Sequence, residues 1–280
     1  MLHIERIGIT TVQDAGRSGF AHLGVPTSGA ADRTSYQLAN RLAGNAPNAA
    51  VFETSGGLSF TALDDVDVVV TGAECDAVAG SRPVAHCSAF VLQRGESLAV
   101  PRVRDGVRTY IAASGGIVGT PILGSLSHDT LSGFVPVSLQ PGAKLAVGTS
   151  VAAPSSLDTP IQPARARTLR VTKGPHHDFV GESNSNHLRR SRFHTSTTSD
   201  RIGVRLLADG PSSAGTAATL RSVPLVRCAV QLTPSGELVV MLADHPTTGG
   251  YPVVAVVHPD DVDRLAQTPG DTVVALEWSD

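Results

Sequence analysis

The sequence lacks the features of several large classes of protein. No apolar run approaches the roughly 18–20 residues that a membrane-spanning helix needs, and the first residues show no charged region, apolar stretch and cleavage site of a secretory signal. The formal net charge is −3, whereas nucleic-acid binders usually carry a strongly basic surface. We therefore expect a cytoplasmic protein with neither a nucleic-acid nor a membrane partner.

Cysteine and lysine are scarce. Cys75, Cys87 and Cys228 lie far apart and form no CxxC pair, so we expect buried thiols rather than a disulfide framework or a zinc ribbon. The two lysines, Lys144 and Lys173, do not lie in the Ala-Met-Lys-Met type of hairpin that carries covalent biotin. Common nucleotide and hydrolase motifs (GxxxxGK[ST], GxSxG, HExxH) are missing as well. If ATP or carboxybiotin is used, its binding must come largely from another chain or from an unusual site.

Short, valine-rich runs bounded by Gly, Pro, Asp or Ser are frequent, as is typical of strands. They cover residues 66–70, 89–92, 109–113, 144–147, 168–171, 237–242, 252–257 and 272–276. Two helices are predicted, one over residues 31–43 and one that opens at Pro259 and ends before Pro269. Closely spaced strands predict a mainly β fold with a few helices, built as two β-barrel-like lobes.

The best linker candidate is the stretch of residues 149–167, which holds three prolines among Ser, Thr and Ala. It divides the chain into an N-terminal β-rich lobe, residues 1–155, and a C-terminal β-rich lobe, residues 156–280. A second polar stretch, residues 181–199, is predicted to form a mobile loop or a short helix.

The first polar segment of functional interest covers residues 10–33. Its four glycines permit close approach of the backbone, and a loop that leads into a helix start suits anionic oxygens. The alternative is an ordinary loop held by Asp–Arg pairs and a helix N-cap. The candidate residues are Asp14, Arg17, His22, Ser28, Asp32 and Arg33.

Two further segments lie in the second half. Asp200 and Arg201 occupy a turn, where such a pair is mostly structural. The loop after the 237–242 strand is richer in polar groups than a connection between strands requires, and Asp244 or His245 could move a proton there. The alternative is an ordinary hairpin loop that carries polar side chains without a functional role. The loop also holds Thr247, Thr248, Gly249, Gly250 and Tyr251, whose hydroxyls and amides suit carboxylate or amide recognition.

The sequence His176-His177-Asp178 could suggest a metal site. Adjacent side chains of a strand point in different directions, so the two histidines are not a natural pair of ligands. No metal site is predicted.

These segments resemble the allophanate hydrolase subunit 2 family, which includes the C subunit of 5-oxoprolinase and is also called biotin-dependent carboxyltransferase. The longest match is Thr-Val-Gln-Asp-x-Gly-Arg-x-Gly-Phe-x-His-Leu-Gly-Val-Pro-x-Ser-Gly-Ala-x-Asp-Arg at 11–33. Leu-Ala-Asp-x-Pro-Thr-Thr-Gly-Gly-Tyr-Pro-Val at 242–253 is the second. Shorter matches occur at 38–45, 69–73, 113–117, 171–175 and 199–206, so the resemblance covers nearly the whole chain in order.

The resemblance implies a β-rich fold with cyclophilin-like barrel character and a partnership with a smaller B subunit, of the allophanate hydrolase subunit 1 type. In 5-oxoprolinase a third protein, the A subunit, completes an enzyme that opens the lactam of 5-oxoproline to glutamate at the expense of ATP. Related domains of urea carboxylase transfer a carboxyl group from carboxybiotin, with biotin carried on another chain or domain. A third role in the family is regulatory binding, without turnover, that relieves inhibition of a kinase.

Under the enzyme hypothesis the three segments converge on one cleft near the partner interface. The catalytic candidates are His22, Asp244 and Asp14. The predicted substrate-binding residues are Arg17, Ser28, Asp32, Arg33, Asp200, Arg201, Thr247, Thr248, Gly249, Gly250 and Tyr251, of which the arginines suit carboxylate or phosphate oxygens. One departure from the family falls at residues 227–231, where Cys228 occupies the position of a frequent glycine.

Overall fold

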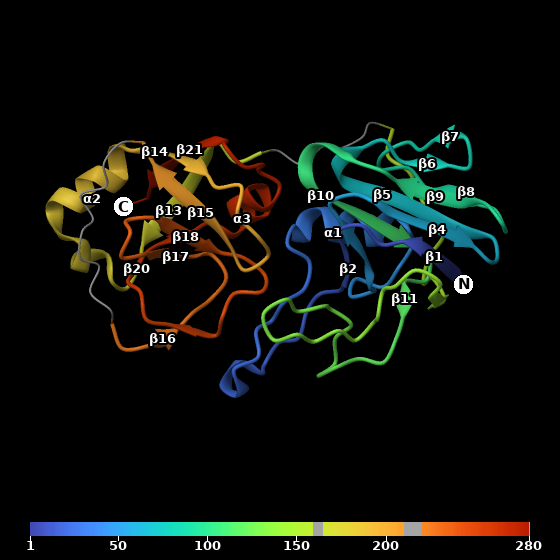
Figure 1. The fold of residues 1–280 in the computed structure, drawn as a ribbon, viewed down its shortest axis with the longest axis horizontal. Helices are drawn as coiled ribbons and strands as arrows, with labels where there is room; N and C mark the ends of the chain where they lie inside the picture. Colours follow the sequence, from blue (N-terminus) through green and yellow to red (C-terminus); the bar gives the residue numbers. More distant parts are fainter. Residues whose placement is uncertain (159–164, 210–219, 280) are drawn as a thin grey trace. The chain divides into compact units, whose positions relative to one another are not determined.

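The computed structural model describes residues 1–158, 165–209 and 220–279 (Figure 1). The chain forms two compact units, which are described separately. The first unit comprises Met1–Arg17, Ser28–Asp129 and Gly133–Pro163, and the second comprises Ser18–Thr27, Thr130–Ser132 and Ala164–Asp280. The second unit therefore includes two short segments from the first half of the chain.

The first unit contains two sheets and helix α1 (Arg33–Leu42). The order of the seven-stranded sheet is β11 (Ile117–Val118), β12 (Lys144–Val147), β1 (Leu2–Arg6), β4 (Leu58–Ala62), β9 (Ser97–Val100), β6 (Val78–Ala79), β7 (Arg82–Pro83). The order of the five-stranded sheet is β2 (Thr10–Gln13), β3 (Val51–Thr54), β10 (Val103–Ala113), β5 (Val66–Cys75), β8 (Phe90–Leu92).

The five-stranded sheet is buried on both faces. Successive side chains of a strand point to opposite faces, so Val68 and Val70 of β5 join the core that also contains residues of β1, β4 and β9. Val69 joins the core formed with α1, and Tyr110 of β10 lies in the same core. This two-sided burial explains why residues 66–70 read as an almost continuous apolar run.

The second unit is built around a closed barrel (Figure 1). Its order is β13 (Thr168–Lys173), β20 (Val253–Val257), β17 (Ala229–Leu232), β18 (Leu238–Met241), β15 (Gly203–Ala208), β14 (Arg192–Thr195), β21 (Val273–Trp278). Parallel pairing of β13 with β21 closes it. The remaining elements are η1 (Ala21–Leu23), η2 (His177–Val180), α2 (Gly181–Arg190), α3 (Pro259–Ala266) and the ribbon of β16 (Val223–Pro224) with β19 (Thr248–Gly249).

The prediction of a mainly β fold with a few helices is confirmed. Helix α1 lies within the predicted residues 31–43, and α3 begins at Pro259, where the missing amide hydrogen costs no hydrogen bond. The polar stretch at 181–199 contains α2 and then β14. The sheet of the second unit closes into a barrel, whereas the first unit has two separate sheets. Part of the predicted linker, residues 159–164, lies outside the described residues.

Within the described ranges, no helix is long and apolar enough to cross a membrane. The same part of the chain holds no group of three or more His, Cys, Asp or Glu side chains that could bind a metal ion. Cys75, Cys87 and Cys228 are buried thiols, as predicted.

Candidate functional site

Asp14 lies just after β2 in the first unit, with 7% of its surface exposed. Its Oδ1 accepts hydrogen bonds from the hydroxyls of Ser125 (2.6 Å) and Ser127 (2.5 Å) and from the amide of Gly16 (2.7 Å). Its Oδ2 accepts one from the amide of Leu126 at 2.6 Å. The carboxylate therefore ties the loop around residues 125–127 to the end of β2.

Arg17 is also held within the first unit. Its side chain is 2% exposed, it donates a hydrogen bond to the carbonyl of Ser127, and its Nε lies 3.4 Å from the carbonyl oxygen of Ile122. The guanidinium lies over the ring of Phe134, 5.5 Å from the centroid, in a cation–π arrangement. The structure thus joins Asp14 and Arg17 through their shared neighbour Ser127.

Asp32 caps helix α1. Its carboxylate accepts from the amide of Ser35 at 3.0 Å and from the Ser35 hydroxyl at 2.5 Å, which satisfies a helix-start amide that has no partner within the helix. Arg33, the first residue of α1, is exposed. Ser28 is fully buried and adopts a left-handed backbone with φ of 55°. For Asp32, the N-cap proposed as the alternative from sequence is observed.

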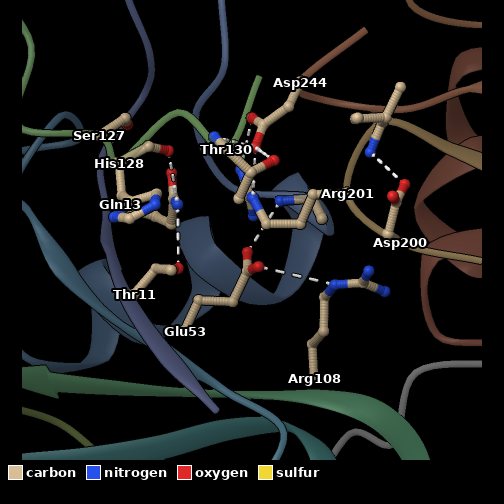
Figure 2. A network of polar contacts seen from close by, with 12 residues as sticks. Thr11, Gln13, Glu53, Arg108, Ser127, His128, Thr130, Asp200, Arg201 and Asp244 are labelled. Atoms are coloured by element: carbon tan, nitrogen blue, oxygen red, sulfur yellow. Dashed lines mark hydrogen bonds and ion pairs between the residues drawn. The ribbon is translucent and has the colours of Figure 1, made fainter. Parts of the chain in front are cut away.

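A buried acidic group that the sequence analysis missed lies beside this cap. Glu53 of β3 is 4% exposed and accepts hydrogen bonds from the amide of Ala31 (2.9 Å) and the hydroxyl of Tyr110 (2.8 Å). The Nε of Arg108 lies 3.6 Å from its other oxygen, as Figure 2 shows. The hydroxyl of Tyr110 in turn accepts from the amide of Asp32. A single glutamate within a strand is common, so the sequence did not indicate this network.

Gln13, in the longest family match, was also not singled out. Its side-chain nitrogen donates to the hydroxyl of Thr11 and to the carbonyl of His128, both at 3.0 Å (Figure 2). The side chain is fully buried. It therefore fixes the loop around residue 128 to strand β2, next to the contacts made by Asp14.

The pH dependence of stability tests the environment of Tyr110. Burial, then the Glu53 and Asp32 carboxylates, raise the pKa of Tyr110 well above its ordinary value of 10.0. A tyrosine whose pKa is higher in the folded state contributes stability that is complete below the unfolded pKa and is lost as the pH rises above it. We expect the free energy of unfolding to fall above about pH 10, with Tyr110 contributing about 1.4 kcal/mol per pH unit.

Urea unfolding followed by circular dichroism between about pH 9 and pH 11 measures this slope. The Tyr110→Phe variant should lose the contribution of one proton. Burial also raises the pKa of Tyr36. Part of the slope should therefore persist in Tyr110→Phe and should decrease further in the double variant that also carries Tyr36→Phe. An unchanged slope in Tyr110→Phe would contradict the assignment.

The second unit contains a buried ion pair between Arg201 and Asp244 (Figure 2). The Arg201 Nε and terminal nitrogen donate to the two oxygens of Asp244 at 2.9 and 3.0 Å, the two-pronged geometry that a guanidinium forms with a carboxylate. The amide and hydroxyl of Thr130 also donate to Asp244, at 3.0 and 2.8 Å. Asp244 is fully buried, and both of its carboxylate oxygens accept hydrogen bonds.

Asp200 and His22 are more accessible. Asp200 accepts from the amides of Ile202 (2.8 Å) and Gly203 (3.1 Å) and so holds the turn before β15. His22 lies on the exposed element η1, with Nδ1 at 3.1 Å from the carbonyl oxygen of Gly19. A carbonyl can only accept, so Nδ1 is the donor and Nε2 of the neutral ring is able to accept a proton.

The loop after Asp244 is tied to the chain before β17. Backbone pairing joins Thr248 to Pro224 and Gly249 to Val223, and the amide of Leu225 donates to the carbonyl of Thr247. Thr248 and Tyr251 are exposed, whereas Thr247, Gly249 and Gly250 are partly exposed. A Cβ at position 249 would lie 2.6 Å from the side-chain nitrogen of Gln231, so a side chain here would require Gln231 to move.

His245 is 7% exposed, and its Nδ1 lies 2.8 Å from the carbonyl oxygen of Pro246. At the departure from the family pattern, Cys228 has a φ of 80°, in the left-handed region that favours glycine. The turn that a glycine would allow is therefore retained with a cysteine, and the amide of Cys228 still donates to the carbonyl of Met241.

Each unit thus brings together part of the predicted site. Asp14, Arg17 and the start of α1 lie in the first unit, and Arg201, Asp244 and the 245–251 loop lie in the second. Their convergence on one cleft remains a prediction. That prediction rests on the ionisable side chains gathered at glycine-rich loops.

The structure is that of a mainly β protein with a closed barrel and with polar loops at the motif positions. The chain belongs to the carboxyltransferase domain family, because the family model for its subdomains A and B matches residues 23–278. The 5-oxoprolinase C subunit of Escherichia coli (strain K12) is 33% identical over 274 residues, which cover 96% of this chain and 88% of that protein. The 5-oxoprolinase C subunit of Haemophilus influenzae is 28% identical over 95% of this chain and 87% of that protein.

Longer proteins contain a similar segment. The urea amidolyase of Lachancea kluyveri is 29% identical over 94% of this chain, a match that spans 16% of that protein. A crystal structure of TTHA0988 superposes with a TM-score of 0.87 at 31% identity, covering 99% of this chain and 55% of that chain. The K. lactis urea amidolyase superposes with a TM-score of 0.86 at 26% identity, covering 98% of this chain and 18% of that one.

Proposed function

We propose that this chain is the C subunit of a cytoplasmic 5-oxoprolinase, which opens 5-oxoproline to glutamate at the expense of ATP. It acts with a smaller B subunit and a third protein, the A subunit. The observation that carries the proposal is the relation to the Escherichia coli 5-oxoprolinase C subunit, which extends over 96% of this chain and 88% of the relative.

The nucleotide is assigned to a partner protein of the complex. Three arginines were predicted to bind carboxylate or phosphate oxygens. Arg33 is exposed at the start of α1, whereas Arg17 and Arg201 are 2% and 8% exposed. Their guanidinium groups are engaged by the carbonyl of Ser127 and the carboxylate of Asp244. Buried and engaged arginines do not fit a phosphate site, so no step is assigned to ATP on this chain.

Among the candidates, His22 is proposed as the proton-transfer group. It is exposed, and its contact with Gly19 leaves Nε2 as the acceptor. Asp244 is proposed as a positioning residue that fixes Arg201 and Thr130, because it is fully buried and accepts hydrogen bonds from both residues. Asp14 is proposed to position the 125–127 loop in the same way.

Substrate recognition is proposed for the loop at 247–251. Thr248 and Tyr251 are exposed and carry hydroxyls, and the partly exposed Gly249 and Gly250 lie between them. Hydroxyl and amide donors suit the carboxylate and lactam oxygens of 5-oxoproline. The pairing with residues 223–225 holds these donors in place.

The test is ATP-dependent release of glutamate from 5-oxoproline by this chain co-purified with its A and B partners. We expect turnover by the complex and at least an order of magnitude less by this chain alone. His22→Ala should lower kcat by about 100-fold, the usual effect of removing a general acid or base. His258→Ala, which removes another exposed histidine of the second unit, should have no effect. An active complex with unchanged kcat in His22→Ala would refute the role of His22, and an inactive complex would refute the function.

The second candidate function is carboxyl transfer from a biotin carrier on another chain to a urea-like amide. The family model and the superposition on urea amidolyase, with a TM-score of 0.86, favour it. Addition of avidin discriminates the two, because avidin sequesters biotin and should inhibit only the transferase. A regulatory binding module would bind its partner and show no turnover in either assay.

A further inference from the structure

A pocket of about 550 Å³ opens in the second unit, at the junction of η2 and α2 with the end of β13. Helix α2 lies beside the barrel in Figure 1 and contacts β21. None of the lining residues was predicted from sequence as part of the site. The pocket is lined by Lys173, His177, Asp178, Gly181, Ser185 and Asn186.

His177 and Ser185 form a hydrogen-bonded pair in this pocket. The imidazole Nδ1 lies 3.0 Å from the carbonyl oxygen of Val254, and Nε2 lies 3.0 Å from the hydroxyl oxygen of Ser185. A carbonyl can only accept, so Nδ1 carries the hydrogen. In the neutral imidazole Nε2 is then the acceptor, and the Ser185 hydroxyl donates to it. A histidine that activates a serine accepts the hydrogen bond from the serine hydroxyl in this direction.

The barrel holds the imidazole in this orientation. The Val254 carbonyl belongs to β20 and also accepts from the amide of Gly174 at 3.1 Å. The chain after β13 approaches β20 so closely that a Cβ at Gly174 would lie 2.4 Å from the Val253 carbonyl oxygen. The His177 ring packs edge-on against Trp278, with centroids 5.0 Å apart. The base is 6% exposed and is held by the barrel, while Ser185 lies on helix α2.

We propose that Ser185 is an acyl-accepting nucleophile, with His177 as its general base, and that the pocket takes a short acyl ester. The Ser185 oxygen attacks the ester carbonyl, and its proton passes to Nε2 of His177. The carbonyl–alkoxide bond breaks, and the alkoxide leaves as an alcohol with that proton. Water then attacks the acyl-serine, delivers a proton to His177 and releases the acid, as Ser185 takes the proton back.

The pocket lining holds one basic side chain, Lys173, and one acidic side chain, Asp178. Lys173 lines the pocket, and its ammonium group can stabilise the negative oxygen that forms on the carbonyl. The Val254 carbonyl takes the place of the carboxylate that orients the histidine in a catalytic triad. The arrangement is defined by contacts within the second unit and does not depend on the proposed 5-oxoprolinase activity.

A fluorophosphonate probe, which reacts with activated serine hydroxyls, tests the proposal on the full-length chain. We expect one-to-one labelling, with the modified peptide containing Ser185. Ser185→Ala should abolish labelling, and His177→Gln should slow it about 100-fold. Ser199→Ala is the matched control, because the Ser199 hydroxyl accepts a hydrogen bond from a backbone amide, that of Arg205. This variant should be labelled at the wild-type rate.

A second measurement does not depend on the folding of the His177 variant. Ser185→Cys places a thiol beside Nε2, where transfer of its proton to the ring speeds alkylation. We expect iodoacetamide to modify it at least 10-fold faster than the thiol introduced by Ser199→Cys. Equal alkylation rates, or labelling by the probe at another serine, would show that the His177–Ser185 bond only attaches α2 to the barrel and would overturn the proposal.

Discussion

Replacing Asp244 by alanine is expected to lower the free energy of unfolding of the second unit by about 3–5 kcal/mol, because it removes the carboxylate from a buried ion pair. The two side chains are 0% and 9% exposed, so the pair is shielded from solvent. Thr130 loses its acceptor at the same time. Urea unfolding followed by tryptophan fluorescence measures the change, since Trp278 is the single tryptophan and lies in barrel strand β21.

The matched control is an exposed ion pair on the same barrel. Arg205 and Glu237 are 3.2 Å apart with side chains 48% and 33% exposed, and such pairs contribute at most about 1 kcal/mol. Glu237→Ala should therefore shift the unfolding midpoint only slightly. A similar loss in the two variants, or a loss below about 1 kcal/mol in Asp244→Ala, would mean that the buried pair does not stabilise the unit.

Replacing Asp14 by alanine is expected to destabilise the first unit by about 2–4 kcal/mol, because buried donors to a carboxylate are left without an acceptor. The amides of Gly16 and Leu126 and the hydroxyls of Ser125 and Ser127 all donate to it. Hydrogen–deuterium exchange should show the loss as faster exchange of amides in residues 122–129. Asp14→Asn, which keeps the volume and one acceptor oxygen, should have a smaller effect.

The control for Asp14 is Asp64, whose carboxylate pairs with the N-terminal ammonium group at 3.2 Å. The two groups are 69% and 51% exposed, so Asp64→Ala should change stability by less than about 1 kcal/mol. Unchanged exchange at residues 122–129 in Asp14→Ala would show that those contacts do not hold the loop.

Local patterns predicted the elements that local physics decides. Helix α3 begins at Pro259 and carries Asp260 and Asp261 in its first turn, where the helix dipole favours negative charge. The longest strands, β5 and β10, overlap the predicted runs at 66–70 and 109–113. Strands such as β1 (Leu2–Arg6), in which only Leu2 and Ile4 are buried, were missed because two apolar residues in five are a weak signal.

The candidate site was predicted less completely. The motif segments directed attention to Asp14, Arg201 and Asp244, and each occupies a polar network. Glu53 and the His177–Ser185 pair had no comparable signal, since a single strand glutamate or a histidine beside a polar helix is common. Whether such a residue is a buried acceptor, a cap or a base depends on the atoms opposite it, which come from other parts of the chain.

The sequence by itself determined the mainly β class, helices α1 and α3 and the family, because these follow from periodicity, helix-end chemistry and motifs that are contiguous in the chain. Tertiary structure alone decided which polar groups are buried and which hydrogen bonds they form. Asp14 meets Ser127, 113 residues away, and Asp244 meets Thr130, 114 residues away. Folding brings such distant partners together and buries both carboxylates among hydrogen-bond donors, which is why we propose a positioning role for them.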